Sequence, residues 1–375
     1  DDVPTPLLNT DKGPLLSEAH QYWQEGSSAR GGKRLSPNTL KEAERAVRYF
    51  TQWHGDMRLG DITKGRARDF RDAIARMPVR LTSKERAKPL RLLLECEAKG
   101  RDLMHVGSVN KYLNLLSAIV TAAEREGRMD KVQGFTNPFN KLSLPADRCG
   151  TEGARRGFAE AELRGLFATG VYTRGDRPTG GAGEAAYWFP LIALLSGARL
   201  NEIAQLRLKD IRDDPDTGIW FIDIGTEGGR SLKTAGSRRQ VPLHGDLVRL
   251  GLLRYRQSRI EAKPKGGLET SLWPEVASAD GFYRSAPWSK WFGRYLRNEA
   301  GVADRGLVFH SFRHTFKRLA RDAGLTEEMH DALTGHAGSG SVGRSYGAGF
   351  GLKALAEAIG RMNAPAPVVS LEPAY

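Results

Sequence analysis

Helical periodicity without any strand-like segment covers the first part of this 375-residue chain and most constrains its fold. Apolar residues recur every three or four positions in segments 36–53, 61–77, 89–98 and 108–126, and a Ser-Pro pair gives the first of them a helix-start signal. Helices with one apolar face are stable when they bury that face against one another. The pattern therefore predicts an all-α domain over residues 15–145.

The pattern changes in the second part of the chain. A stretch with proline, glycines and charges predicts a linker over residues 146–157. Segments 219–224 and 239–243 contain β-branched and aromatic residues and flank a glycine-rich turn, which predicts a small antiparallel sheet. Most of the remaining sequence up to residue 362 is helical in pattern. We expect a mainly α protein whose second domain, 158–362, is α+β.

The longest apolar run and the two cysteines argue against several classes of protein, and both chain ends lack a regular pattern. Prolines without periodicity predict an irregular leader, 1–14, and a flexible tail, 363–375. The longest apolar run, 185–195, is shorter than the about 20 residues of a membrane span, so it predicts a buried helix. Cys96 and Cys149 lie far apart, which argues against a disulfide framework or a zinc site. We expect a cytoplasmic protein without membrane contact.

The chain is basic in both parts. Lys and Arg number 57 against 44 Asp and Glu, a net charge of +13. Up to residue 150 there are 26 basic and 19 acidic residues, and beyond it 31 and 25, so the excess is +7 and +6. Two basic domains suit a polyanionic partner, although a basic protein without a nucleic-acid partner has the same charge.

A basic run in the first domain is a candidate DNA contact. A solvated helix face is the equally open alternative. The run consists of Arg80, Lys84, Arg86, Lys88 and Arg91.

Six residues of the second domain could cleave a phosphodiester without a metal or a cofactor. Arginines neutralise charge on the non-bridging oxygens, a tyrosine attacks, and lysine and histidine move protons. Taken singly, each has an ordinary structural reading, such as a salt bridge or a solvated loop residue. The six are Arg199, Lys233, His310, Arg313, His336 and Tyr346.

The motifs around these residues carry a family resemblance. They are Gly-x-Arg-x-x-Glu at 197–202, Lys-Thr and then Arg-x-Val-Pro-Leu within 233–243, His-x-x-Arg-His at 310–314, and Leu-Thr-Gly-His at 333–336, with Tyr346 ten residues after the last. In this order they resemble the tyrosine recombinase (phage integrase) family. The resemblance implies a helical core-binding domain followed by an α+β catalytic domain. The first half of the chain resembles the family only in its pattern of helices.

The resemblance also implies roles. Tyr346 would attack the scissile phosphate to give a 3′-phosphotyrosyl intermediate. Arg199 and Arg313, with His336, would stabilise the developing charge, and Lys233 would protonate the leaving 5′-oxygen.

The first histidine of the third motif would serve the same site. His310 would accept the tyrosine proton or hold a phosphate oxygen. His314 lies four residues after His310, a spacing that also suits a metal. Because no carboxylate or thiolate nearby completes a ligand set, His314 is interpreted as a packing residue.

The resemblance implies double-stranded DNA with specific recombination sites as the partner. Four protomers would exchange strands through a Holliday junction, with a monomer in free solution and accessory DNA-bending or directionality proteins as further possibilities. A role in a mobile element and a nucleoid-associated location when bound follow. The apolar face of 352–362 would dock on a neighbouring protomer or pack within its own chain. A type IB topoisomerase and a catalytically silent DNA-binding regulator are the alternatives.

Overall fold

The computed structural model describes residues 11–29, 35–95, 101–145, 156–227, 237–276, 285–336 and 349–375. The chain separates into two compact units, Asp1–Thr151 and Glu152–Tyr375, each with its own apolar core. None of the helices within the described ranges combines the length and apolar character that crossing a membrane requires.

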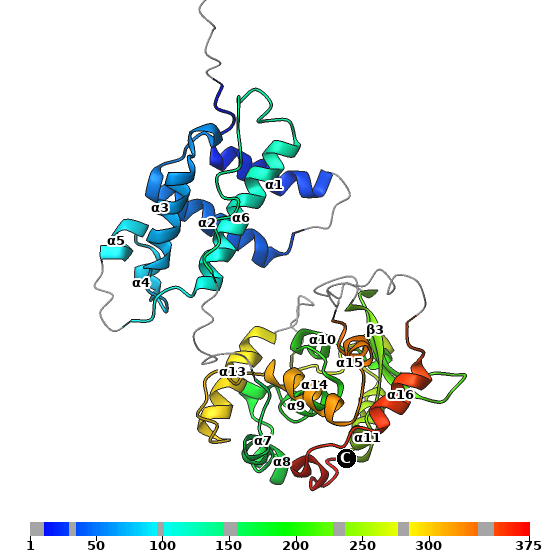
Figure 1. The fold of residues 1–375 in the computed structure, drawn as a ribbon. Helices are drawn as coiled ribbons and strands as arrows, with labels where there is room; N and C mark the ends of the chain where they lie inside the picture. Colours follow the sequence, from blue (N-terminus) through cyan, green and yellow to red (C-terminus); the bar gives the residue numbers. More distant parts are fainter. Residues whose placement is uncertain are drawn as a thin grey trace, which may run out of the picture. The chain divides into compact units, whose positions relative to one another are not determined.

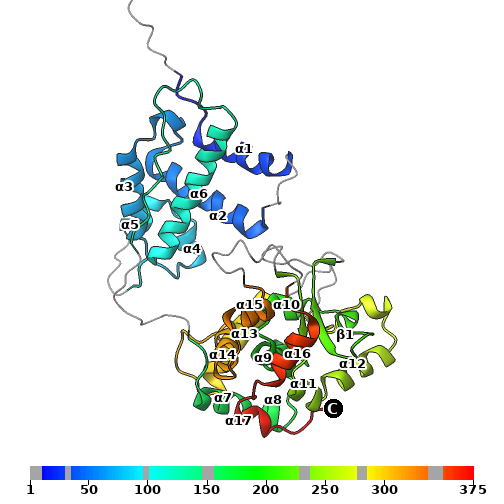
Figure 2. The ribbon, with the colours of Figure 1, turned by 45° about the vertical axis from the view of Figure 1, so that its right-hand side comes forward.

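In the described part of the first unit, the named secondary-structure elements are all helices. Its helix α6 lies at the centre, against α1, α2 and α3 (Figures 1 and 2). The start of α2 follows the expected signal, because the Ser36 hydroxyl accepts the Thr39 N–H at 3.1 Å and proline occupies the first helical position. The helices are α1 (Leu16–Ala29), α2 (Pro37–His54), α3 (Lys64–Ala75), α4 (Ser83–Arg86), α5 (Leu90–Glu95) and α6 (Val106–Arg125).

The second unit combines helices with one small sheet, so the expected fold class is confirmed. The sheet has the order β1-β2-β3 with antiparallel neighbours. Two of its strands fall on the expected segments, whereas β1 has three residues, too few to show an alternating pattern. The elements are α7 (Glu160–Phe167), α8 (Gly170–Thr173), α9 (Ala185–Ser196), α10 (Leu200–Ala204), β1 (Ile211–Asp213), β2 (Trp220–Ile224), β3 (Arg239–Pro242), α11 (Gly245–Arg249), α12 (Leu252–Glu261), α13 (Ser285–Asn298), α14 (Ser311–Asp322), α15 (Glu327–Thr334), α16 (Leu352–Gly360) and α17 (Ala366–Val369).

Helix α9 forms the centre of the second unit and explains the longest apolar run of the sequence. Every one of its residues is buried, and α14 lies beside it (Figure 1). The helix ends at Gly197, whose φ of 66° is left-handed. A Cβ there would lie 2.6 Å from the Phe316 ring and 2.8 Å from Thr334 Cγ2, so only glycine fits. This close turn leads the chain directly into Arg199 and α10.

The expected flexible tail, 363–375, is wrong. Val368 of α17 is fully buried, and α17 packs against α7 (Figure 2). The Arg249 guanidinium donates to the carbonyls of Val368 at 3.0 Å and Leu371 at 2.8 Å. The Tyr375 ring centroid lies 6.4 Å from that of Trp188. The sequence did not reveal this order because α17 is a single helical turn, too short to show periodicity. Arg249, which binds it, lies more than a hundred residues earlier in the sequence.

Of the expected leader, 1–14, residues 1–10 lie outside the described part of the chain, and residues 11–14 are held by main-chain hydrogen bonds. Pro14 O accepts the Leu59 N–H at 2.9 Å, and Lys12 O accepts the Gly60 N–H at 2.8 Å. These main-chain bonds, which side-chain patterns do not reveal, fix residues 11–14 on the first unit. Of the expected linker, only Arg156 and the glycine after it lie within the described residues, and Arg156 pairs with Glu162 of α7 at 2.6 Å.

Candidate active site

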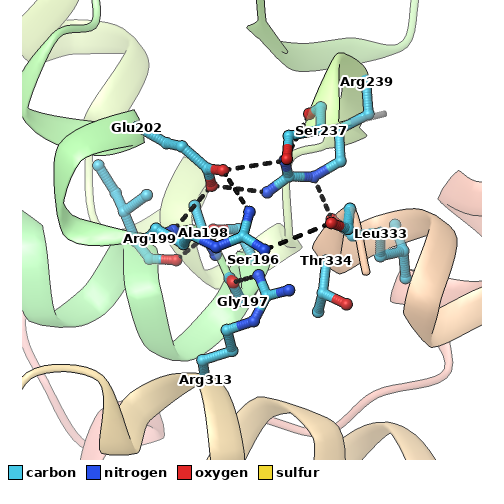
Figure 3. Close-up of polar contacts among 12 residues, drawn as sticks. Ser196, Gly197, Ala198, Arg199, Glu202, Ser237, Arg239, Arg313, Leu333 and Thr334 are labelled. Carbon is cyan, nitrogen blue, oxygen red and sulfur yellow. Dashed lines mark hydrogen bonds and ion pairs between the residues drawn. The ribbon is translucent and has the colours of Figure 1, made fainter. Parts of the chain in front are cut away.

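The site is built around one buried carboxylate, that of Glu202, whose side chain is 4% exposed. Arg199 occupies the N-cap position of α10, and its backbone N–H donates to Glu202 Oε2 at 2.8 Å. The Arg199 Nη1 donates to Glu202 Oε1 at 2.7 Å (Figure 3). The salt bridge weighed from the sequence is therefore present. It holds the guanidinium of Arg199, whose side chain is 21% exposed, with one nitrogen on the carboxylate.

A second arginine from the sheet binds the same carboxylate. Arg239, the first residue of β3, donates to Glu202 through Nη2 at 2.8 Å and Nη1 at 3.3 Å. Its Nε donates to Leu333 O at 2.7 Å, and its Nη1 to Ser237 O at 2.8 Å (Figure 3). The Arg239 side chain is only 6% exposed. It therefore connects β3, α10 and the end of α15.

Arg313 of α14 brings a third guanidinium to this place. Its Nη1 donates to Gly197 O at 2.8 Å, two residues before Arg199 (Figure 3). Its Nη2 is buried without a hydrogen-bond partner among the described residues. Burial, followed by the charges of Arg199 and Arg239, lowers the pKa of Arg313 to about 9. The group remains charged at neutral pH, but it is short of an anion.

The balance of charge around Glu202 is positive. Burial alone raises the pKa of this carboxyl, but the charges and hydrogen bonds of Arg239 and Arg199 outweigh burial and lower it. Among the described residues, the Glu202 carboxylate thus binds two guanidinium groups, and Arg313 adds a third positive charge nearby. Such an arrangement suits a second anion, which would come from a ligand.

His336 follows the end of α15, as the sequence predicted. Gly335 caps the helix with a left-handed φ of 61°, and a Cβ there would lie 2.8 Å from Arg239 Nη1. The His336 N–H donates to Asp331 O at 3.0 Å, and its side chain is exposed. Arg199 Nη2 reaches Gly335 O at 3.4 Å. The peptide that precedes His336 therefore contacts two of the arginines.

A buried ion pair fixes α15 on α14. Lys317 Nζ lies 2.8 Å from Asp331 Oδ1, and His330 Nδ1 lies 3.2 Å from the same oxygen. Burial raises the pKa of Asp331, but Lys317 outweighs that effect and lowers it. This pair holds together the two helices that contribute Arg313 and His336.

His310 lies at the N-cap position of α14 and is half-buried. Its ring is edge-on to that of His314, with 5.5 Å between centroids. Within the described ranges, no three His, Cys, Asp or Glu side chains are placed to share a metal ion.

The structure thus brings Arg199 and Arg313 together with the end of α15 that precedes His336, and places His310 three residues before Arg313. Lys233 and Tyr346 lie outside the described residues. In the sequence, Lys233 falls between β2 and β3, and Tyr346 between α15 and α16.

The sequence analysis did not predict that Arg239 binds Glu202 and connects β3 to α10 and α15. It treated this residue only as part of a motif beside Lys233. Part of the signal lay in the sequence, because alternate residues of a strand share a face and the residue two positions after Arg239 is the apolar Val241, which the structure shows fully buried. An arginine on the inward face of a strand needs a carboxylate partner, and Glu202 provides it.

The basic run of the first unit does not form one helix face. Arg80 precedes α4, is 73% exposed and lies 3.2 Å from Asp102. Lys84 in α4 and Lys88 after it are exposed. Arg91 of α5 donates to Trp53 O at 3.2 Å and lies over the Trp53 ring at 5.4 Å. For Arg86, the structure describes the backbone in α4 but not the side chain.

Known proteins resemble the chain in structure but not in sequence. No protein-family model matches it, and no curated protein sequence is significantly similar. The Tn1549 transposon integrase in complex with transposon right end DNA matches with a TM-score of 0.52 at 18% identity, over 91% of this chain and 97% of that one. A lambda integrase dimer bound to a COC′ core site gives 0.53 at 17%, over 90% and 79%. A lambda integrase tetramer bound to a Holliday junction gives 0.51 at 17%, over 90% and 82%. The resemblance to tyrosine recombinases is thereby confirmed at the level of the fold: this chain has the integrase fold.

Proposed function

We propose that this protein is a site-specific DNA recombinase that cleaves and rejoins DNA through a covalent bond to Tyr346. The observation that carries the proposal is the buried Arg313 guanidinium, which has a free Nη2 among the described residues and lies near Arg199 and Arg239. A phosphodiester would supply an acceptor oxygen for this nitrogen and negative charge beside the three guanidinium groups. The integrase fold supports the same choice.

In the proposed reaction, the Tyr346 phenol oxygen attacks the scissile phosphorus and its proton passes to His310. Arg199 and Arg313 stabilise the charge that develops on the non-bridging oxygens. The bond from phosphorus to the 5′-oxygen breaks, and Lys233 donates a proton to that oxygen. The products are a 3′-phosphotyrosyl bond and a free 5′-hydroxyl.

Rejoining is the reverse reaction with the 5′-hydroxyl of an exchanged strand. Because the phosphotyrosyl bond conserves the energy of the phosphodiester, the cycle needs no ATP. His336 would donate a hydrogen bond to the scissile phosphate. We further propose that four protomers act on two DNA sites through a Holliday junction.

A covalent adduct tests the proposal. The full chain is incubated in EDTA with nicked duplexes drawn from the DNA that flanks its gene, and a denaturing gel separates free from protein-bound strands. We expect an adduct from the wild type and none from Tyr346→Phe. Tyr375→Phe is the matched control, because this tyrosine stacks near Trp188 and Tyr255, and we expect it to keep the adduct.

Other outcomes identify the alternatives. Tight binding without an adduct, on a duplex shown to contain the bound site, would indicate a silent DNA-binding regulator. An adduct together with relaxation of supercoiled plasmid, but without strand exchange between paired sites, would indicate topoisomerase activity. In the latter case Tyr346 keeps its role and only the recombinase assignment fails.

A further inference from the structure

We propose that Arg239 is a positioning residue of this site: it fixes the Arg199 guanidinium through their shared partner Glu202 and fixes the end of α15 through Leu333. The inference rests on the proposed function, because it concerns how the same site is held. It assigns to Arg239 no contact with the phosphodiester.

The contacts of Arg239 differ in kind from those of Arg313. The Arg239 Nε, Nη1 and Nη2 all donate to protein oxygens, on Leu333, Ser237 and Glu202. Arg313, in contrast, keeps its Nη2 without a partner among the described residues. An arginine whose three nitrogens all donate to protein oxygens has little left for a ligand, whereas one with an unpaired nitrogen can donate to a phosphate oxygen. The two buried arginines therefore have different tasks.

The position of Arg239 lets one side chain control two others. Glu202 Oε1 accepts from both Arg199 Nη1 at 2.7 Å and Arg239 Nη1 at 3.3 Å, so a shift of the carboxylate would move the Arg199 guanidinium. Leu333 O, two residues before Gly335, accepts from Arg239 Nε at 2.7 Å. Gly335 also has no room for a Cβ against Arg239. The strand residue thus sets the spacing between α10 and the turn that carries His336.

The planar fork is essential to this role. Only a guanidinium can meet both carboxylate oxygens with two nitrogens and a carbonyl with the third. A lysine keeps the charge but offers a single nitrogen, so it cannot hold Glu202 and Leu333 in the same geometry. Since a displacement of about 1 Å can cost about a hundredfold in rate, the substitution Arg239→Lys should affect the chemical step.

The experiment measures single-turnover adduct formation on the nicked duplexes, with the 375-residue chain at a saturating concentration. We expect Arg239→Lys to slow adduct formation about ten- to a hundredfold. Its affinity for the same duplex, measured in the Tyr346→Phe background, should change less than about threefold, because Arg239 makes no ligand contact. An unchanged rate, or a loss confined to affinity, would overturn the proposal.

Arg249→Lys is the matched control. Arg249 also joins one carboxylate, of Asp246 at 2.8 Å, to the carbonyls of Val368 and Leu371. None of its hydrogen bonds goes to a site residue that the structure describes, so its substitution should lower the melting temperature while the rate per folded molecule stays at the wild-type value. If Arg249→Lys slowed adduct formation as much as Arg239→Lys, the effect would be one of general stability and the proposal would fail.

A second variant covers the case in which Arg239→Lys does not fold. The double substitution Glu202→Gln/Arg239→Gln removes the most deeply buried ion pair as a whole, so neither of these two groups is left as a lone buried charge, whereas the more exposed Arg199 side chain loses its carboxylate partner. We expect it to fold and to show at least the same loss of rate. Wild-type speed in the double variant would overturn the proposal.

A modified substrate separates Arg239 from the leaving-group step. With sulfur in place of the 5′-bridging oxygen, the departing thiolate needs no proton, so a defect in proton donation is rescued. The Arg239→Lys defect should remain. Rescue would assign Arg239 to leaving-group protonation and overturn its role through Arg199. Absence of an adduct from the wild type on every duplex would instead refute the proposed function, and this inference with it.

Discussion

At the scale of single residues, the site combines a satisfied arginine, a shared carboxylate and an unsatisfied arginine. Arg239 and Glu202 form an ion pair at 2.8 Å, whereas the Arg313 Nη2 has no hydrogen-bond partner among the described residues. Side chains arranged to bind a charged transition state often repel one another in the free protein. This repulsion lowers the free energy of unfolding. This contrast predicts opposite stability effects for two neighbouring substitutions.

The substitution Arg313→Gln should raise stability while it removes activity. The lowered pKa of about 9 means that the folded protein holds this proton less tightly than the unfolded chain does. At neutral pH the charged group therefore costs folding energy. We expect a higher melting temperature for Arg313→Gln and a loss of adduct formation of at least about a hundredfold.

The pH dependence checks the cause. The stability advantage of Arg313→Gln should shrink as the pH rises past about 9, because the wild-type guanidinium then loses its proton in the folded state. Calorimetric melting of both proteins between neutral pH and pH 10 measures it. A melting temperature of Arg313→Gln below that of the wild type at neutral pH would contradict the charge argument.

The substitution Glu202→Gln should act in the opposite direction. The pKa of this buried carboxyl is lowered by its arginine partners, so its contribution to stability is complete above the ordinary carboxyl pKa. That contribution is lost as the pH falls through the lowered value. We expect Glu202→Gln to reduce the free energy of unfolding at neutral pH by about 3–5 kcal/mol. Urea unfolding at several pH values measures this: as the pH falls into the acid range, the free energy of unfolding should decrease less for Glu202→Gln than for the wild type.

At the scale of elements, the sequence predicted what local patterns encode. The long helices α2 and α6 lie where periodicity placed them, α9 lies on the longest apolar run, and the strands β2 and β3 lie on the segments with β-branched and aromatic residues. The three-residue strand β1 and the single turn of α17 gave no pattern, because each is stabilised by distant residues. The motifs indicated Arg199 and Arg313 but not the role of Arg239, since the carboxylate it binds lies 37 positions earlier.

The ordered segment after residue 362 makes a prediction about α17. Val368 is fully buried, so Val368→Ala removes two methyl groups from a packed core and leaves a cavity. We expect a loss of about 1–3 kcal/mol in the free energy of unfolding, measured by urea denaturation. The neighbouring Val369, which is 55% exposed, provides the matched control, because Val369→Ala should change stability by less than about 0.5 kcal/mol. Equal, negligible effects would restore the interpretation of 363–375 as a flexible tail.

At the scale of the whole molecule, the positive charge is shared by two units that each have a separate core. The charge excess is +7 up to residue 150 and +6 beyond it. Cations that neutralise DNA phosphates release counterions, so the logarithm of the binding constant falls linearly with the logarithm of salt concentration. If both units contact DNA, each contributes its own part of that slope.

We therefore expect the full chain to show a steeper salt dependence than either unit alone. The two units, produced separately by division within residues 146–155, should show slopes of similar size, because their charge excesses are nearly equal. In the full chain, Lys84→Ala should reduce the slope by about one, since this exposed side chain would lose one phosphate contact. Fluorescence anisotropy on one duplex between about 50 and 200 mM salt measures all of these slopes. A slope carried entirely by the second unit and unchanged by Lys84→Ala would assign the basic run to a solvated surface, and DNA binding to the second unit alone.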